Sequence, residues 1–228
     1  MTAGELLAII RADYLDDVVG SENWSDTQLL REIGRAQQQA CYRQDLRHLI
    51  DSFQIMLIEG QRGYELDPVV LRLDDVSFAG VPLIFTTRAA MDQCCYGWRN
   101  YEPGIPKRFY VMGRTLYMDR EPSINEDGLM LDIQHWRLPL ILPEELAKDD
   151  DLEWINDPEQ LAHWVAFRAF MRRDEDTQDK EKAAEHPALF NASFGAEVPA
   201  QARSELLAQP DTIGVKPLRN RPVLAEEW

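Results

Sequence analysis

The feature that most constrains this chain is the spacing of its apolar residues, which changes twice. Leu6, Leu7 and Ile10 recur at the spacing of one helix face, whereas from Phe53 onward the apolar residues form short β-rich runs. Helical spacing returns after Asp157. This helix–strand–helix order predicts an α+β fold, in which the two outer segments pack together and the middle segment is inserted between them.

We therefore divide the chain into four parts. Residues 1–50 are expected to form N-terminal helices, residues 51–142 a small antiparallel β domain, and residues 143–209 an acidic connector with the C-terminal helices. The helices of the first and third parts together make a helical bundle. Residues 210–228 contain three prolines and few apolar anchors, so they cannot build a core and form an extended arm.

The N-terminal part is expected to hold two helices, the first over residues 3–14. The second has a clear start, because Ser25 and Gln28 have the spacing of a capping box. Trp24 and Leu29 flank that box at the spacing of a hydrophobic staple.

The β domain is expected to consist of short strands separated by turns. Gly113 marks the tip of a hairpin, and a short helix begins after Thr87. The expected strands are residues 53–59, 69–73, 76–79, 83–86, 108–112, 115–119 and 129–136.

The connector, residues 143–159, holds eight acidic residues and one lysine, which predicts a solvated segment. Its run of Asp149, Asp150 and Asp151 lacks the spaced ligands and the glycine of a calcium loop. We expect no metal site there.

The next helix begins with Asp157 as N-cap and Pro158 at its first position, and extends to about residue 173. It is apolar nearly all round, which predicts a central place in its domain. Arg168 is its one odd charge and requires an ion pair or a subunit contact.

Two further helical segments follow. Asp176 or Thr177 caps the first, Pro187 starts or kinks another that ends at Gly195, and Pro199 opens the last helix.

The charge and the cysteines narrow the functional classes. The chain carries 24 basic and 40 acidic residues, a formal charge of −16, which argues against a conventional nucleic-acid binder but not against a protein that lets DNA pass without sticking. Cys41, Cys94 and Cys95 predict buried thiols in a reducing compartment rather than a disulfide framework. We find neither a signal peptide nor an apolar run long enough for a membrane span.

The sequence contains no catalytic, cofactor-binding or metal-binding motif. His48, His135, His163 and His186 are far apart in the sequence, and no His/Cys cluster, nucleophile elbow or phosphate-binding loop is present. We therefore predict no catalytic residue, no metal and no cofactor.

Several segments resemble the head-to-tail connector (adaptor) proteins of tailed bacteriophages and prophages. The resemblance covers roughly residues 1–200, in order. Its segments are the helix after residues 24–26, residues 71–76 with 83–88, and residues 161–170, 172–179, 183–186 and 190–195.

The resemblance implies a structural virion protein of the neck region, made in the bacterial host cytoplasm. Such proteins form a ring, usually dodecameric, that binds the portal, carries the tail or nozzle proteins and continues the DNA channel without sequence-specific DNA binding. No membrane is involved.

Two groups of residues are candidates for contacts. Between Gly214 and Pro222 the arm carries three basic residues and no acidic one, which favours docking on an acidic neighbour or the portal. The arm candidates are Val215, Lys216, Leu218, Arg219, Arg221 and Trp228, and the candidates for core or subunit contacts are Trp24, Leu161, Trp164, Arg168, Phe190 and Phe194.

Two alternatives from other classes remain open. The abundance of Asp and Glu also fits a hydrolytic enzyme that uses a carboxylate pair. It fits equally a cytosolic adaptor that binds basic partners through an acidic surface, with an affinity that falls at moderate salt.

Overall fold

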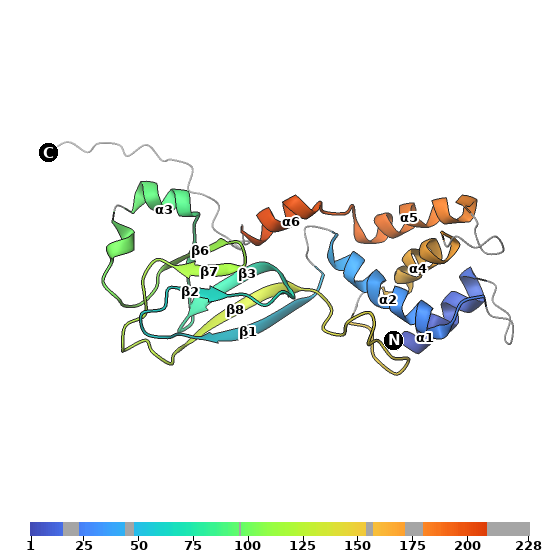
Figure 1. Cartoon of the computed structure of the whole chain (residues 1–228), viewed down its shortest axis with the longest axis horizontal. Coiled ribbons are helices and arrows are strands. Elements are labelled where there is room, and N and C mark those ends of the chain that lie inside the picture. Colours follow the sequence, from blue (N-terminus) through green and yellow to red (C-terminus); the bar gives the residue numbers. More distant parts are fainter. Residues whose placement is uncertain (16–22, 44–47, 96, 154–156, 172–179, 209–228) are drawn as a thin grey trace.

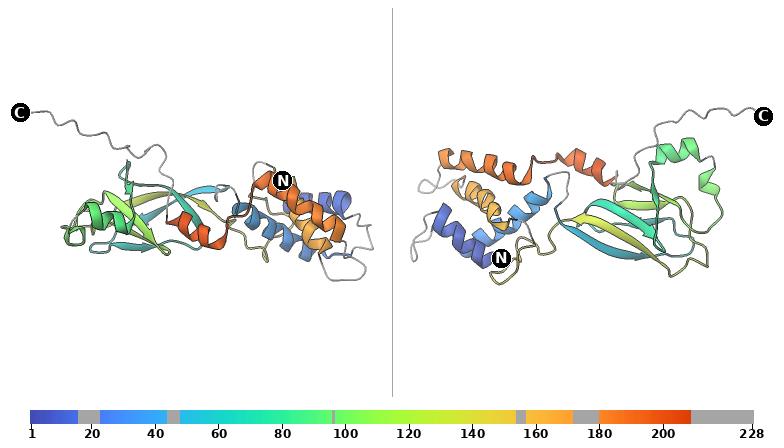
Figure 2. Two further views of the ribbon diagram at one scale, coloured as in Figure 1. Left: turned by 90° about the horizontal axis from the view of Figure 1, so that it is seen from above. Right: turned by 180° about the vertical axis from the view of Figure 1, so that it is seen from behind.

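The computed structural model of the chain describes residues 1–15, 23–43, 48–95, 97–153, 157–171 and 180–208. It confirms a mixed α+β fold, with a helical part and a β part that lie side by side along the longest axis (Figure 1). Two further views show the same separation (Figure 2). Each part has its own buried apolar cluster.

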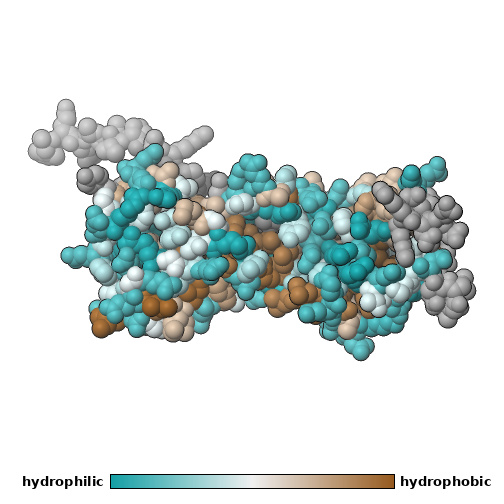
Figure 3. Space-filling model, in the orientation of Figure 1, coloured by the Kyte–Doolittle hydropathy of each residue, from teal (hydrophilic) through white to brown (hydrophobic). Residues whose placement is uncertain are grey.

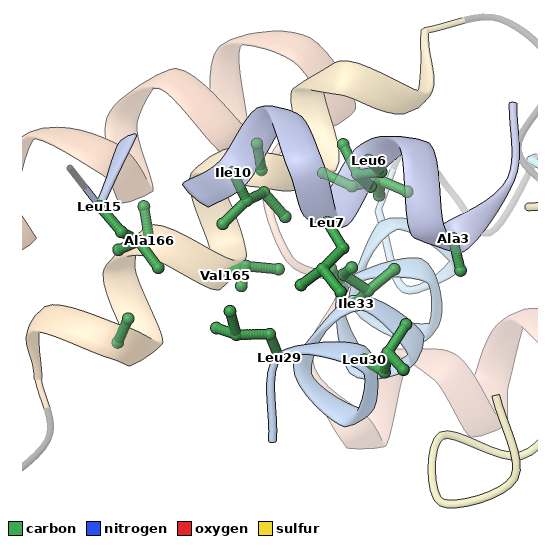
Figure 4. Close-up of a cluster of buried hydrophobic side chains, with 14 of the residues drawn as sticks. Ala3, Leu6, Leu7, Ile10, Leu15, Leu29, Leu30, Ile33, Val165 and Ala166 are labelled. Carbon is green, nitrogen blue, oxygen red and sulfur yellow. The ribbon is translucent and has the colours of Figure 1, made fainter. Parts of the chain in front are cut away.

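The helical part is built from both ends of the chain. Helix α2 packs against α1 and α4, and α4 packs against α5. Figure 4 shows Leu6 and Ile10 from the first segment, Leu29 and Ile33 from α2, and Val165 from α4 in one cluster. The helices are α1 (Ala3–Ile9), which continues as the π-helical turn η1 (Ile10–Tyr14), α2 (Asp26–Cys41), α4 (Leu161–Phe170) after the 3₁₀ turn η4 (Pro158–Gln160), and α5 (Lys180–Phe194).

The start of α2 follows the predicted capping box. The amide of Gln28 donates to Ser25 Oγ (3.3 Å), and the amide of Ser25 donates to Gln28 Oε1 (3.4 Å). Trp24 and Leu29 are both buried in the same cluster, as a hydrophobic staple requires. This local prediction is confirmed.

The predicted start of the helix after the connector is confirmed in position, because Asp157 is the N-cap and Pro158 the first residue of the 3₁₀ turn that leads into α4. The side chain of Asp157 makes no cap hydrogen bond there. The prediction for Pro187 was wrong, because this residue does not start a new segment but lies inside the continuous helix α5. Ala183 and Phe190 are buried on either side of the proline, so packing holds both halves of the helix in place despite the missing N–H. The predicted caps at Asp176 and Thr177 lie outside the described residues.

The β part consists of two four-stranded sheets that enclose an apolar core. The first has the order β1-β8-β3-β4 and the second the order β2-β7-β6-β5. The strands are β1 (Ile50–Met56), β2 (Gly63–Glu65), β3 (Val70–Phe78), β4 (Val81–Pro82), β5 (Ile84–Phe85), β6 (Arg108–Met112), β7 (Thr115–Met118) and β8 (Met130–Arg137).

Three details of the β part differ from, or sharpen, the sequence analysis. The domain is not wholly antiparallel, because β5 and β6 pair in parallel. The expected strands 69–73 and 76–79 form the single strand β3, whose register shifts absorb the polar pair between them. The predicted hairpin is present between β6 and β7, with Gly113 at a φ of +64°.

A short helix, α3 (Arg88–Cys94), projects from the β part. The amide of Ala90 donates to Thr87 Oγ1 (3.1 Å), so the helix begins where the sequence predicted. Together with the 3₁₀ turn η3 (Trp98–Asn100) it covers a small third cluster that contains Met91, Trp98 and Tyr110.

The acidic connector is not simply solvated. The amides of Ala3 and Gly4 donate to the carbonyls of Asp150 and Lys148, each at 2.8 Å. Leu146 and Leu152 are buried in the helical core. The connector therefore packs against α1, while most of its carboxylates stay exposed.

The last described helix, α6 (Ala200–Leu207), begins after Pro199 as predicted. We expected it among the helices of the bundle, but it contacts β3, and Leu207 is buried in the β core. The apolar end of this short helix thus joins the C-terminal segment to the β part.

Candidate interaction surface

The predicted core or contact residues all lie in the helical part. Leu161, Phe190 and Phe194 are fully buried, and the rings of Phe190 and Phe194 are 4.7 Å apart between centroids. Trp164 is only partly buried and tilts against Phe190 at 5.6 Å. The three fully buried residues are therefore core, and Trp164 lies at its margin.

The other two predicted residues, Trp24 and Arg168, line a groove between α2 and α4. The groove has a volume of about 280 Å³. Its apolar surface comes from both helices and their flanking residues. Three arginines also line the groove. The lining residues are Trp24, Gln28, Leu29, Arg31, Glu32, Arg35, Val165, Arg168, Ala169 and Met171.

The carboxylate of Glu32 forms ion pairs with two of these arginines. Its Oε1 accepts a hydrogen bond from Arg35 Nη1 (2.8 Å), and its Oε2 lies 3.4 Å from Arg168 Nε. The predicted ion pair of Arg168 is confirmed, but the arginine is not buried, because 46% of its side chain is exposed. Arg31 is exposed on the same face of the groove.

The groove is consequently cationic on an acidic chain. Three arginines and one carboxylate line it, and Arg35 also reaches the exposed Glu144 at 3.7 Å. Two buried polar atoms of its lining, Trp24 Nε1 and Glu32 Oε2, have no hydrogen-bond partner in the described structure. Buried polar atoms without partners are uncommon in folded proteins and call for an explanation.

A pair of histidines was missed by the sequence analysis, which described the four as far apart. His163 Nδ1 lies 3.3 Å from His186 Nδ1, one on α4 and one on α5. The ring of Tyr14 meets His163 edge-on (5.4 Å), and Phe170 stacks on His186 (5.9 Å). Burial lowers the pKa of both histidines, and the charge of His186 lowers that of His163 further.

The described residues contain no group of three or more His, Cys, Asp or Glu side chains that could hold a metal. Within the same ranges, no helix is long and apolar enough to cross a membrane.

Two of the three cysteines are buried as predicted. Burial raises the pKa of the Cys41 thiol to about 12, so it stays protonated and unreactive at neutral pH. Cys95 is buried beneath α3. The side chain of Cys94 lies outside what the structure describes.

The arm candidates Val215, Lys216, Leu218, Arg219, Arg221 and Trp228 also lie outside the described residues. The structure therefore leaves their role as a prediction.

Comparison with families of known proteins places this chain among the phage head-to-tail adaptor proteins. Residues 1–214 match the family described as SU10 adaptor protein, and the chain belongs to that family. A comparison with individually curated proteins gives no match. The family agrees with the resemblance drawn from the sequence.

Proposed function

We propose that this protein is a structural component of the virion neck that joins the portal to the tail. In this role, twelve copies form a ring that continues the DNA channel and carries the tail or nozzle proteins. The observation that carries the proposal is the family match over residues 1–214. The protein is made in the host cytoplasm and acts without a cofactor.

Exposed apolar residues support a protein that assembles with others. Five exposed apolar residues lie at the paired ends of β1 and β8 and in the loops next to them: Met56, Ile58, Ile124, Leu129 and Met130. The amides of Leu57 and Gly128 hold the two loops together through the carbonyls of Leu129 (2.8 Å) and Leu57 (2.9 Å). Figure 3 shows apolar surface along the lower edge of the β part and at its junction with the helical part. Such surfaces suit the heterologous contacts of a closed ring.

The charge supports passage of DNA. A formal charge of −16 repels the phosphate backbone, and exposed carboxylates such as Glu144, Glu145 and Asp149 contribute to that repulsion. An acidic body around a channel would let DNA slide without adhesion.

The arm supplies the second element of the proposal. Lys216, Arg219 and Arg221 would engage an acidic surface of the portal or of a neighbouring copy, while Val215 and Leu218 add apolar contact. Ordering of such a segment on its partner couples its folding to binding.

The test is assembly of the purified full chain with the portal protein of the same phage. Negative-stain electron microscopy should show rings on the portal, and mass photometry should give the mass of twelve copies. A chain that stays monomeric and does not bind the portal would contradict the proposal.

A further inference from the structure

We propose that the groove between α2 and α4 is a receptor for an acidic, aromatic segment of this same chain, residues Val223–Trp228. The segment reads Val-Leu-Ala-Glu-Glu-Trp. The inference goes beyond the neck assembly proposed above, because it concerns one groove and one peptide and holds whether or not the chain forms rings.

The size and lining of the groove suit side chains rather than a metabolite. Its volume of about 280 Å³ lies just below the range of small-molecule sites, which begins at about 300 Å³. Leu29, Val165, Ala169 and Met171 give it an apolar surface between the two helices. A tryptophan or leucine side chain would bury its apolar area against that surface.

The charges of groove and segment are complementary. Arg31, Arg35 and Arg168 outnumber the single carboxylate of Glu32. Glu226 and Glu227 bring two carboxylates immediately before an aromatic side chain. Guanidinium groups bind carboxylates with paired, charge-assisted hydrogen bonds, which fixes the segment along the rim.

The lining also has two buried polar atoms that make no hydrogen bond in the described structure. Trp24 Nε1 is a donor, and Glu32 Oε2 is an acceptor that is ion-paired with Arg168. A peptide backbone carries a carbonyl for the first and an amide for the second. An occupant that reaches Trp24 Nε1 would remove the cost of leaving that buried donor unpaired.

Another stretch of the chain combines acids with apolar residues but is already engaged. Leu152 is buried in the helical core, and Glu153 is bound by Arg137. The basic middle of the arm, with Lys216, Arg219 and Arg221, has the wrong charge for a cationic groove. Val223–Trp228 therefore fits better than either.

The experiment measures binding of a fluorescein-labelled peptide, residues 220–228, by fluorescence anisotropy. The receptor is the full-length chain carrying Glu226→Lys, Glu227→Lys and Trp228→Ala, so that its own segment does not compete. We expect saturable binding that weakens as salt is raised. A peptide with both glutamates changed to lysine should bind at least tenfold more weakly.

A pair of receptor variants locates the site. Arg31→Glu, at the groove, should weaken binding at least tenfold. Arg88→Glu, an equal charge change on an exposed arginine of α3, should leave it unchanged. Thermal melting of both variants checks that they fold.

Absence of saturable binding would overturn the inference. Equal losses in both variants would do the same, because they would show a general charge effect. Ring formation on the portal is measured separately, so either proposal can fail without the other.

Discussion

His163 and His186 face one another across α4 and α5, with their Nδ1 atoms 3.3 Å apart. One nitrogen donates and the other accepts only while at least one of the rings is neutral; two protonated rings would place two donors and two positive charges in contact. The pair therefore joins two helices through a contact that depends on pH.

The protein should lose stability in mild acid. Burial lowers the pKa of His163 and His186 below the ordinary 6.5, and burial also lowers that of His48, to about 4, and of His135. Between the lowered values and 6.5 the unfolded chain binds more protons than the folded chain, so the free energy of unfolding rises with pH. The contribution of His163 and His186 to the free energy of unfolding is fully present above pH 6.5, and it is lost as the pH falls toward their lowered pKa values. Urea denaturation across this range measures it.

A double variant isolates the contribution of the His163–His186 pair to this pH dependence. In the double variant His163→Gln, His186→Gln, the midpoint of urea denaturation should change less between pH 7.5 and pH 5 than it does in the unmodified chain. These pH values lie roughly one unit or more on either side of the ordinary histidine pKa of about 6.5. His48→Gln serves as the comparison at a histidine outside the contact. An unchanged pH dependence in the double variant would contradict this expectation, because it would show that the pair binds protons equally in the folded and the unfolded chain.

Phe190→Ala should destabilise the fold by about 3–5 kcal/mol, because it leaves a cavity in a fully buried cluster. Trp164→Ala should cost less than Phe190→Ala, since Trp164 is only partly buried and its Nε1 has no hydrogen-bond partner among the residues that the structure describes. Thermal or chemical denaturation ranks the two. The reverse order would mean that Trp164, not Phe190, is the more important of the two for the core.

Gly34→Ala should destabilise α2, although alanine is the better helix former by about 1 kcal/mol. A Cβ at position 34 would lie 2.6 Å from Pro143 Cα in the connector, so the backbone has to move. Overpacking of this kind costs about 1–3 kcal/mol. A rise in melting temperature would show that the connector yields easily there.

Deletion of residues 210–228 should leave the two apolar clusters folded, because a segment with few apolar anchors adds little to a core. Binding to the portal and ring formation should weaken. Unfolding of the truncated chain would contradict the first expectation, and normal assembly would contradict the second. The charge reversal of Lys216, Arg219 and Arg221 to glutamate in the full chain tests the basic part alone.

The sequence predicted what depends on neighbours along the chain. The Ser25–Gln28 box and the glycine turn of the β6–β7 hairpin involve residues a few positions apart, and both are present. The helix–strand–helix order was sufficient to predict the mixed α+β fold.

What the sequence did not predict depends on pairing between distant segments. The His163–His186 contact requires the facing of α4 and α5, and the groove requires that of α2 and α4. Strand β3 was read as two runs because Asp74 and Asp75 interrupt its apolar pattern, and only pairing with β8 shows it to be one. Arg168 was identified as a contact residue, but its partner Glu32 was not.

The discontinuous helical part has a consequence for synthesis of the chain. The ribosome makes α1 and α2 first and completes the strands at Arg137, before α4 and α5 exist. The β part can therefore fold before Leu6, Ile10 and Leu29 have Val165 and its neighbours to pack against. A chain that has not yet reached α4 has only the α2 wall of the groove, so that surface is complete only after the β part has been synthesised.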